Sequence, residues 1–206
     1  MKIIAIISQK GGAAKTTLAT HLAVEAIRQG KQAAIIDLDP QASAARWKDI
    51  READTPVVLS AQAARLKEVF TQAQEAGIDL LFLDTAPHSD SISIAAARSA
   101  DFILIPTKCS MFDFQAVPNS VDIAVSVAKK PTAIVLCEVP VRGTTVEQVR
   151  EGLESLGVDI CPYTTGDRAA YRNAVAVGLT APEYEPHGKA AEEIKQLYAW
   201  VYNKVV

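Results

Sequence analysis

The stretch MKIIAIISQKGGAAKTT, residues 1–17, decides the fold. Residues 3–7 form a run of β-branched and small apolar side chains, which predicts a buried strand. The chain then passes through Gly11 and Gly12 and continues as a helix with Lys15 and Thr16 at its start. A strand that runs through glycines into such a helix is typical of a phosphate-binding loop, because backbone N–H groups and the helix N-terminus attract anions.

The loop residues predict the parts of a nucleotide site. We expect Lys15 to neutralise the β- and γ-phosphates and the Thr16 hydroxyl to reach Mg²⁺. The residues expected to contact the nucleotide are Gly11, Gly12, Ala13, Ala14, Lys15, Thr16 and Thr17. The alternative is a glycine turn between a strand and a helix, with incidental lysines.

The loop departs from the common pattern GxxxxGK[ST], because Gln9 and Ala14 stand where that pattern has glycines. It fits the form KGGxxK[ST], with Lys10 at its head, and so resembles the ParA/MinD family of deviant Walker A ATPases. The resemblance implies that Lys10 reaches across a dimer to the nucleotide of the partner and acts with Lys15 in catalysis. If Ala14 needs a positive φ, alanine costs on the order of 1 kcal/mol there and weakens nucleotide binding.

Length and composition predict one soluble α/β domain over residues 1–206. The chain is 49% hydrophobic and 22% charged, with no apolar run near the roughly 20 residues of a membrane span. Its three cysteines are widely spaced, which predicts reduced thiols in a cytoplasmic protein without a signal peptide. A net charge of −3 disfavours a dedicated nucleic-acid binder, so any DNA affinity must come from a local patch.

Strand-like and helix-like runs alternate along the whole chain. This pattern predicts an α/β fold, a mostly parallel twisted sheet with helices on both faces, of the P-loop NTPase type. The expected strands after the first are 32–38, 56–59, 79–83, 102–106, 132–137 and 158–160. The expected helices are 18–30, 42–53, 61–76 (capped by Ser60), 91–99, 113–128, 146–156, 167–177 and 187–204.

Acidic residues follow two of these strands, at the edge where open α/β sheets bind ligands. An apolar run ends in Asp84, which we expect to hold Mg²⁺ beside Thr16; a simple turn residue is the alternative. The run Asp37-Leu38-Asp39-Pro40-Gln41 resembles the DxDPQ signature of the same family. That resemblance implies that Asp39 positions the attacking water and that Asp37 lies near the metal or the first loop. The alternative is a turn in which an aspartate caps the helix that starts at Ala42, and both roles can hold at once.

The likeness covers nearly the whole chain. Residues 105–107 and 113–116 resemble the family's loop and helix after the next strand, and residues 167–174 and 189–193 resemble ParA proteins without an added N-terminal DNA-binding domain. Where relatives often carry Asn before the adenine loop, this chain has Glu138, followed by Pro140. We therefore expect Glu138 and Pro140 near the nucleotide base.

For DNA, the candidates are Arg168, Arg172 and Lys195. Arg168 and Arg172 are four residues apart, which places them on one face of the expected helix. The alternative is a solvated helix face. Dimerisation would double the patch and make binding depend on ATP.

The resemblance implies an ATPase that positions a plasmid, a chromosome or another cargo over the nucleoid. ATP and Mg²⁺ would be its cofactors, ATP would form a homodimer that binds non-specific DNA, and a centromere-binding or cargo adaptor protein would stimulate slow hydrolysis. A membrane-cycling ATPase of the MinD type is less favoured, because residues 197–206 fit a core helix better than an amphipathic extension, and we expect no stable membrane insertion. A nucleotide-dependent metabolic enzyme of the same fold is the third class.

Overall fold

The computed structural model describes residues 1–110, 114–140 and 146–206. Within these ranges the strands form one seven-stranded parallel sheet in the order β3-β2-β4-β1-β5-β6-β7. They are Lys2–Ile6 (β1), Ala33–Asp37 (β2), Val57–Ser60 (β3), Leu80–Asp84 (β4), Phe102–Thr107 (β5), Thr132–Leu136 (β6) and Asp159–Ile160 (β7). The predicted parallel α/β fold is confirmed.

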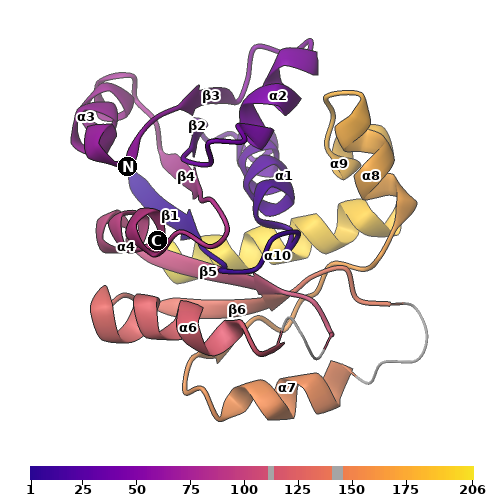
Figure 1. Ribbon diagram of the computed structural model, residues 1–206. Coiled ribbons are helices and arrows are strands. Elements are labelled where there is room, and N and C mark those ends of the chain that lie inside the picture. Colours follow the sequence, from indigo (N-terminus) through magenta and orange to yellow (C-terminus); the bar gives the residue numbers. More distant parts are fainter. Residues whose placement is uncertain (111–113, 141–145) are drawn as a thin grey trace.

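Helices cover both faces of this sheet (Figure 1). They are α1 (Lys15–Arg28), α2 (Ser43–Ile50), α3 (Leu66–Glu75), α4 (Asp90–Ser99), α6 (Val117–Val121), α7 (Val146–Glu154), α8 (Ala169–Ala176), α9 (Ala181–Tyr184) and α10 (Lys189–Val205). A 3₁₀ turn, Ala63–Arg65, precedes α3, and a π-helical segment, Asp122–Val127, follows α6. Among the helices in the described ranges, none has both the length and the apolar character that a membrane span requires.

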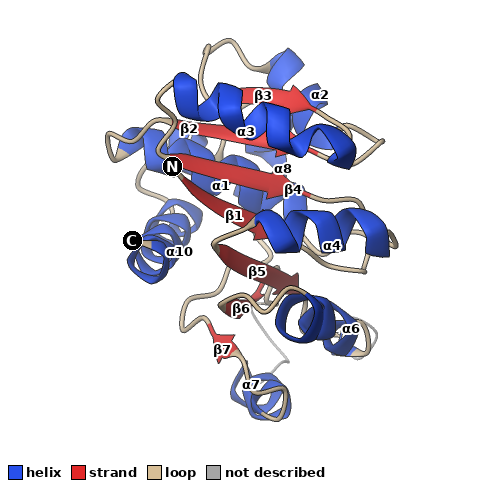
Figure 2. Ribbon diagram, turned by 90° about the vertical axis from the view of Figure 1, so that its left-hand side faces the viewer, coloured by secondary structure: helices blue, strands red, loops and turns tan. Residues whose placement is uncertain are grey.

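The alternation of side chains along the strands creates two cores, one on each face of the sheet. Ile4 and Ile6 of β1 belong to the core that α1 and α10 cover, whereas Ala5 belongs to the core on the opposite face. Figure 2 shows α3, α4, α6 and α7 on that opposite face. Both faces are buried, which explains why the strands read as continuous apolar runs.

Several predicted boundaries differ from the structure. Ser60 does not cap a helix; it ends β3 in register with Asp37, and α3 begins only at Leu66. The second helix ends at Ile50 because Arg51 takes an extended conformation. The predicted helix 113–128 starts outside the described residues, and its described part changes to a π-helix after Val121. The short helix α9 was not predicted at all.

The strand order decides where the predicted site residues meet. β4 lies between β1 and β2, and Asp84 is in register with Ile6 on one side and Asp37 on the other. The loop after β1, the loop after β2 and the end of β4 therefore share one edge of the sheet. This edge is where ligands bind in parallel α/β folds.

Candidate functional site

The loop between β1 and α1 has the backbone of a phosphate cradle. Gly12 and Ala14 both lie in the left-handed region, each with φ of 71°. Ala14 is the residue before α1, so the strained alanine directly precedes the first free N–H groups of the helix. The conformation that would make Ala14 costly is therefore present.

Lys15 lies inside this loop. Its side chain turns back, and Nζ donates hydrogen bonds of 3.1 Å to the carbonyl oxygens of Ser8 and Lys10. Burial lowers the pKa of Lys15, while the carboxylates of Asp84 and Asp39 act in the opposite direction. The loop thus holds an ammonium group against its own carbonyl oxygens at the start of α1, where a polyanion could pair with it.

Thr16 and Asp84 meet as the sequence predicted. The Thr16 hydroxyl donates a 2.6 Å hydrogen bond to Asp84 Oδ2. Asp84 is fully buried, and its other oxygen, Oδ1, lacks a hydrogen-bond partner within the described part of the protein. Burial raises the pKa of Asp84 to about 7, although the hydrogen bond from Thr16 lowers it.

A buried carboxylate oxygen without a partner costs free energy unless something else satisfies it. Mg²⁺ fits this requirement, because it is bound by few protein oxygens and completes its shell with water and phosphate oxygens. In the described ranges no group of three or more His, Cys, Asp or Glu side chains could hold a metal ion by itself. Thr16 and Asp84 are thus the residues that would hold Mg²⁺ here, together with a phosphate ligand.

Asp37 holds the loop after β2 and also lies beside Asp84, with which it is in register across the paired strands β2 and β4. One oxygen accepts the Asp39 N–H at 3.0 Å, and the other accepts the N–H groups of Ala44 and Ala45 at 2.9 and 3.1 Å. Both carboxylate oxygens are thus used to hold the β2–α2 loop and the start of α2, and the charge of Asp37 adds to burial in raising the pKa of Asp84. Asp37 thus binds N–H groups at the start of α2, and its place near a metal ion stays a prediction.

Asp39 stands at the rim of the phosphate site. Its Oδ1 accepts the Gln41 N–H at 2.9 Å, so the side chain is fixed by its own turn. It lines a cavity of about 360 Å³ beside the phosphate loop. The other lining residues are Gly12, Ala13, Ala14, Lys15, Thr16, Thr17, Thr20, Ser43, Trp47, Pro87, Glu138 and Val175.

A family model described as the CobQ/CobB/MinD/ParA nucleotide binding domain matches residues 4–199. The chain belongs to this family. The phosphate loop, Asp39 and Asp84 all lie inside the matched region.

Individual comparisons agree with the family. Maintenance of carboxysome distribution protein A from Halothiobacillus neapolitanus is 29% identical over 204 residues, which cover 94% of this chain and 93% of that protein. Protein IncC from Escherichia coli is 26% identical and covers 100% of this chain and 70% of its own length. The septum site-determining protein MinD from Pyrococcus horikoshii, solved with Mg-ADP, has a TM-score of 0.79 at 17% identity and covers 97% of this chain and 95% of its own.

A second cavity of about 380 Å³ adjoins the phosphate cavity of this family member and shares Ala14, Thr17, Glu138 and Val175 with it. Glu138 has a φ of 51° and pairs with Lys108 at 2.6 Å. The rest of the lining is Thr165, Gly166, Asp167, Arg168, Tyr171, Arg172 and Ala176. Pro140, in contrast, is exposed and lines neither cavity, so the structure does not bring it to the site with Glu138.

The three DNA candidates do not form one patch. Arg168 lies before α8 in an extended conformation, so it does not share a helix face with Arg172 as predicted. Arg168 pairs with Glu193, and Arg172 pairs with Asp167 at 2.6 Å. Lys195 lines a separate cavity at the end of α1. Arg172 and Lys195 are exposed, whereas Arg168 lines the second cavity and is held there by Glu193.

Trp47 and Val175 line the phosphate cavity from α2 and α8, and sequence reasoning missed both. Neither belongs to a motif, and a tryptophan in an amphipathic helix reads as a core residue. Their place in the site depends on how α2 and α8 pack, which no local pattern reports.

Proposed function

We propose that this protein is a Mg²⁺-dependent ATPase of the ParA type that positions a cargo by ATP-controlled binding to DNA. The observation that carries the hydrolytic part is the buried pair of Thr16 and Asp84, with Asp84 Oδ1 unpaired among the described residues beneath the phosphate loop. Membership of a family that contains nucleotide-dependent positioning proteins supports the rest.

Each residue has a role in this proposal. The backbone N–H groups of Gly11 to Ala14 and the ammonium of Lys15 bind the phosphates, while Thr16 and Asp84 hold the metal ion. Bound Mg²⁺ would offset the negative charge that develops on the phosphate oxygens. Asp39, held by its own turn at the cavity rim, orients the attacking water. The base lies in the second cavity, next to Glu138.

Lys10 couples nucleotide to dimerisation in the proposal. Its backbone is fixed in the loop, because its N–H donates to Ser8 Oγ and its carbonyl oxygen accepts from Lys15. Its half-buried side chain would reach the phosphates of a second copy. Lys10→Ala should therefore keep ATP binding but lose the ATP-dependent dimer, as measured by light scattering. A dimer that survives this change would contradict the arrangement.

DNA binding and cargo complete the proposal. The relative from Halothiobacillus is named for the distribution of carboxysomes, which supports a positioning role for a cargo such as a plasmid, a chromosome or a larger body. Arg172 and Lys195 remain the exposed candidates for phosphate contacts, in a cytoplasmic, nucleoid-associated protein. A centromere-binding or cargo adaptor protein would stimulate hydrolysis and release the dimer.

The decisive experiment measures binding to non-specific duplex DNA with ATP, ADP or no nucleotide, across a salt series. We expect binding with ATP alone, falling steeply as salt rises because condensed counterions are released. Arg172→Ala should lose DNA retention, and Lys195→Ala, which lies outside both nucleotide cavities, should weaken DNA retention and keep ATP turnover. Absence of DNA binding in every state, with turnover intact, would reject this role and direct attention to anionic liposomes or to metabolic substrates.

A further inference from the structure

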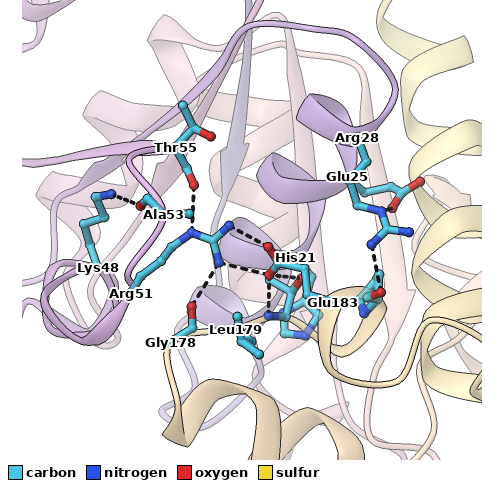
Figure 3. Close-up of polar contacts among 12 residues, drawn as sticks. His21, Glu25, Arg28, Lys48, Arg51, Ala53, Thr55, Gly178, Leu179 and Glu183 are labelled. Carbon is cyan, nitrogen blue, oxygen red and sulfur yellow. Dashed lines mark hydrogen bonds and ion pairs between the residues drawn. The ribbon is translucent and has the colours of Figure 1, made fainter.

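A buried ion pair joins two helices far from each other in the chain, outside the site described above. Arg51, just after α2, has a side chain that is only 4% exposed. Its Nη2 donates to Glu183 Oε1 of α9 at 2.6 Å, and its Nη1 donates to Glu183 Oε2 at 3.0 Å. Figure 3 shows this bidentate contact at the centre of a wider group of polar contacts.

The same guanidinium also holds two backbone segments. Nε donates to the Thr55 carbonyl oxygen at 2.7 Å, and Nη1 donates to that of Gly178 at 3.0 Å (Figure 3). Gly178 fits against this helix end closely, because a Cβ there would lie 2.7 Å from the backbone N and Cα of Arg51. The end of α2 is thus seated in the corner between α8 and α9.

Two further contacts secure that corner. The Trp47 indole N–H donates to the Leu179 carbonyl oxygen at 3.1 Å, and the Arg51 guanidinium lies 5.0 Å from the Trp47 ring centre. Glu183 Oε2 also accepts the N–H and the hydroxyl of Thr180, which caps α9. Glu183 therefore connects the start of α9 to the end of α2.

α1 is fixed to the same short helix. His21 Nδ1 lies 2.7 Å from the Thr17 carbonyl oxygen, and Nε2 accepts the Ala181 N–H at 3.0 Å. Burial lowers the pKa of His21 to about 4, so the ring is neutral near pH 7 and Nδ1 carries the proton. Arg28 adds a 2.8 Å hydrogen bond to the Pro182 carbonyl oxygen.

These contacts matter because α1 and α2 border the phosphate cavity from two sides. α1 begins with Lys15 and Thr16, and α2 follows the turn that holds Asp39. Thr20 of α1 and Trp47 of α2 both line the cavity. A third element, α9, therefore connects the two helices that border the cavity.

We propose that Arg51 and Glu183 are positioning residues that hold Asp39 at the correct distance from the phosphate site. The inference rests on the proposed hydrolysis, in which the alignment of water determines the rate. A displacement of about 1 Å at such a group can cost on the order of 100-fold in rate. The pair itself touches neither the phosphate loop nor Asp39, so loss of the pair should lower kcat and leave nucleotide affinity nearly unchanged.

The test uses the double variant Arg51→Met with Glu183→Gln in the full chain. It removes both charges together, so no unpaired buried ion remains, and the glutamine side chain keeps an acceptor for Thr180. We expect kcat for ATP to fall at least about 10-fold, with the dissociation constant for Mg-ATP changed by less than about twofold. Deuterium uptake of residues 37–46, measured without nucleotide, should rise, because α2 is held at one end only.

Two controls separate positioning from general loss of stability. Lys204→Met with Asp159→Asn removes an exposed ion pair between α10 and β7 and should change neither kcat nor uptake at residues 37–46. Leu153→Ala opens the buried core under α7 and lowers the melting temperature, but should leave kcat unchanged. If the double variant does not fold, Arg51→Lys takes its place, because it keeps the charge beside Glu183 but cannot make all three contacts.

The outcomes are distinguishable. Unchanged kcat together with unchanged uptake at residues 37–46 would overturn the inference, and so would equal losses in kcat and affinity. A native protein that binds Mg-ATP and never hydrolyses it would reject the proposed function. The deuterium uptake of residues 37–46 would still decide whether the pair holds that segment.

Discussion

Two buried polar regions of this protein differ in whether their polar groups have hydrogen-bond partners. At the phosphate site, Asp84 is fully buried and one of its oxygens is unpaired among the described residues. At the corner between α8 and α9, Arg51 and Glu183 form an ion pair, and both also make hydrogen bonds with backbone groups. Because an unsatisfied buried group costs free energy, the first region indicates a ligand site and the second a structural support.

The two carboxylates also differ in their pKa. Burial raises the pKa of Asp84 to about 7. Burial also raises the pKa of Glu183, but hydrogen bonds from Arg51 and Thr180 outweigh it, so that pKa lies below its ordinary value. The charge of Asp84 is therefore unfavourable until a cation arrives, whereas the charge of Glu183 is already compensated.

The largest expected effect is on catalysis at Asp84. Asp84→Ala should lower kcat/KM for Mg-ATP by about 1,000-fold or more, because a metal-stabilised charge is worth several kcal/mol. Steady-state hydrolysis with varied Mg²⁺ measures this loss. Glu151→Ala, on the exposed face of α7, should behave like the native protein. Activity that survives without Asp84 would remove it from the metal site.

The next largest effect is on the free energy of unfolding, after loss of the Arg51–Glu183 pair. Arg51→Met should lower the free energy of unfolding by about 3 kcal/mol, because it leaves the Glu183 carboxylate without its buried partner. Arg65→Met breaks an exposed pair with Glu68 and should leave the free energy of unfolding nearly unchanged, because water screens exposed charges. Urea unfolding at pH 7 compares the two variants. Equal losses of unfolding free energy in the two variants would mean that burial does not strengthen the Arg51–Glu183 pair.

The third prediction concerns pH. Native Asp84 keeps its proton up to about pH 7, whereas the unfolded carboxyl ionises near 3.8, so Asp84 makes the protein less stable as pH rises between these values. The shift corresponds to at most about 4 kcal/mol. Asp84→Asn should therefore be more stable than the native protein at pH 8, with a smaller difference at pH 5, without Mg²⁺ or nucleotide.

His21 changes stability in the opposite direction over part of this range. Its lowered pKa of about 4 costs stability as pH falls below its ordinary value of 6.5. His21 is present in both the native protein and Asp84→Asn, so the difference between their free energies of unfolding reports the effect of Asp84. A difference in unfolding free energy that does not vary with pH would show that Asp84 is ionised before the cation binds.

The smallest effect is at Ala14. Ala14→Gly should raise the free energy of unfolding by about 1 kcal/mol, because glycine adopts the observed φ of 71° without strain. Ala45→Gly, inside α2, should lower it by a similar amount, because glycine is a poor helix former. Urea unfolding of both variants tests the signs. A loss at Ala14 would mean that the loop is not strained by its alanine.

The places of the predicted phosphate-site residues in the fold have a common cause. The phosphate loop, Asp39 and Asp84 follow or end apolar strands whose carboxyl ends meet at one edge of the sheet. Lys15 and Thr16 are set by the same local turn and helix start. A strand followed by glycines and Lys-Thr therefore predicts a phosphate-binding loop from a few adjacent residues.

The expectations that failed depended on distant partners. Ser60 was expected to cap a helix, but pairing with β2 keeps it in a strand. Arg168 was expected on the surface of a helix, but Glu193 of α10 binds it at the wall of the second cavity.

The sequence alone determined the parallel α/β class, and it predicted the meeting of Thr16 and Asp84 that the structure shows, because strand periodicity and the loop motif each depend on adjacent positions. Only the tertiary structure decided that Arg51 meets Glu183, 132 residues later in the chain, and that α9 holds α1 and α2 together. A buried ion pair is specified by which helix ends come together, and two isolated charges in a sequence do not reveal their partner.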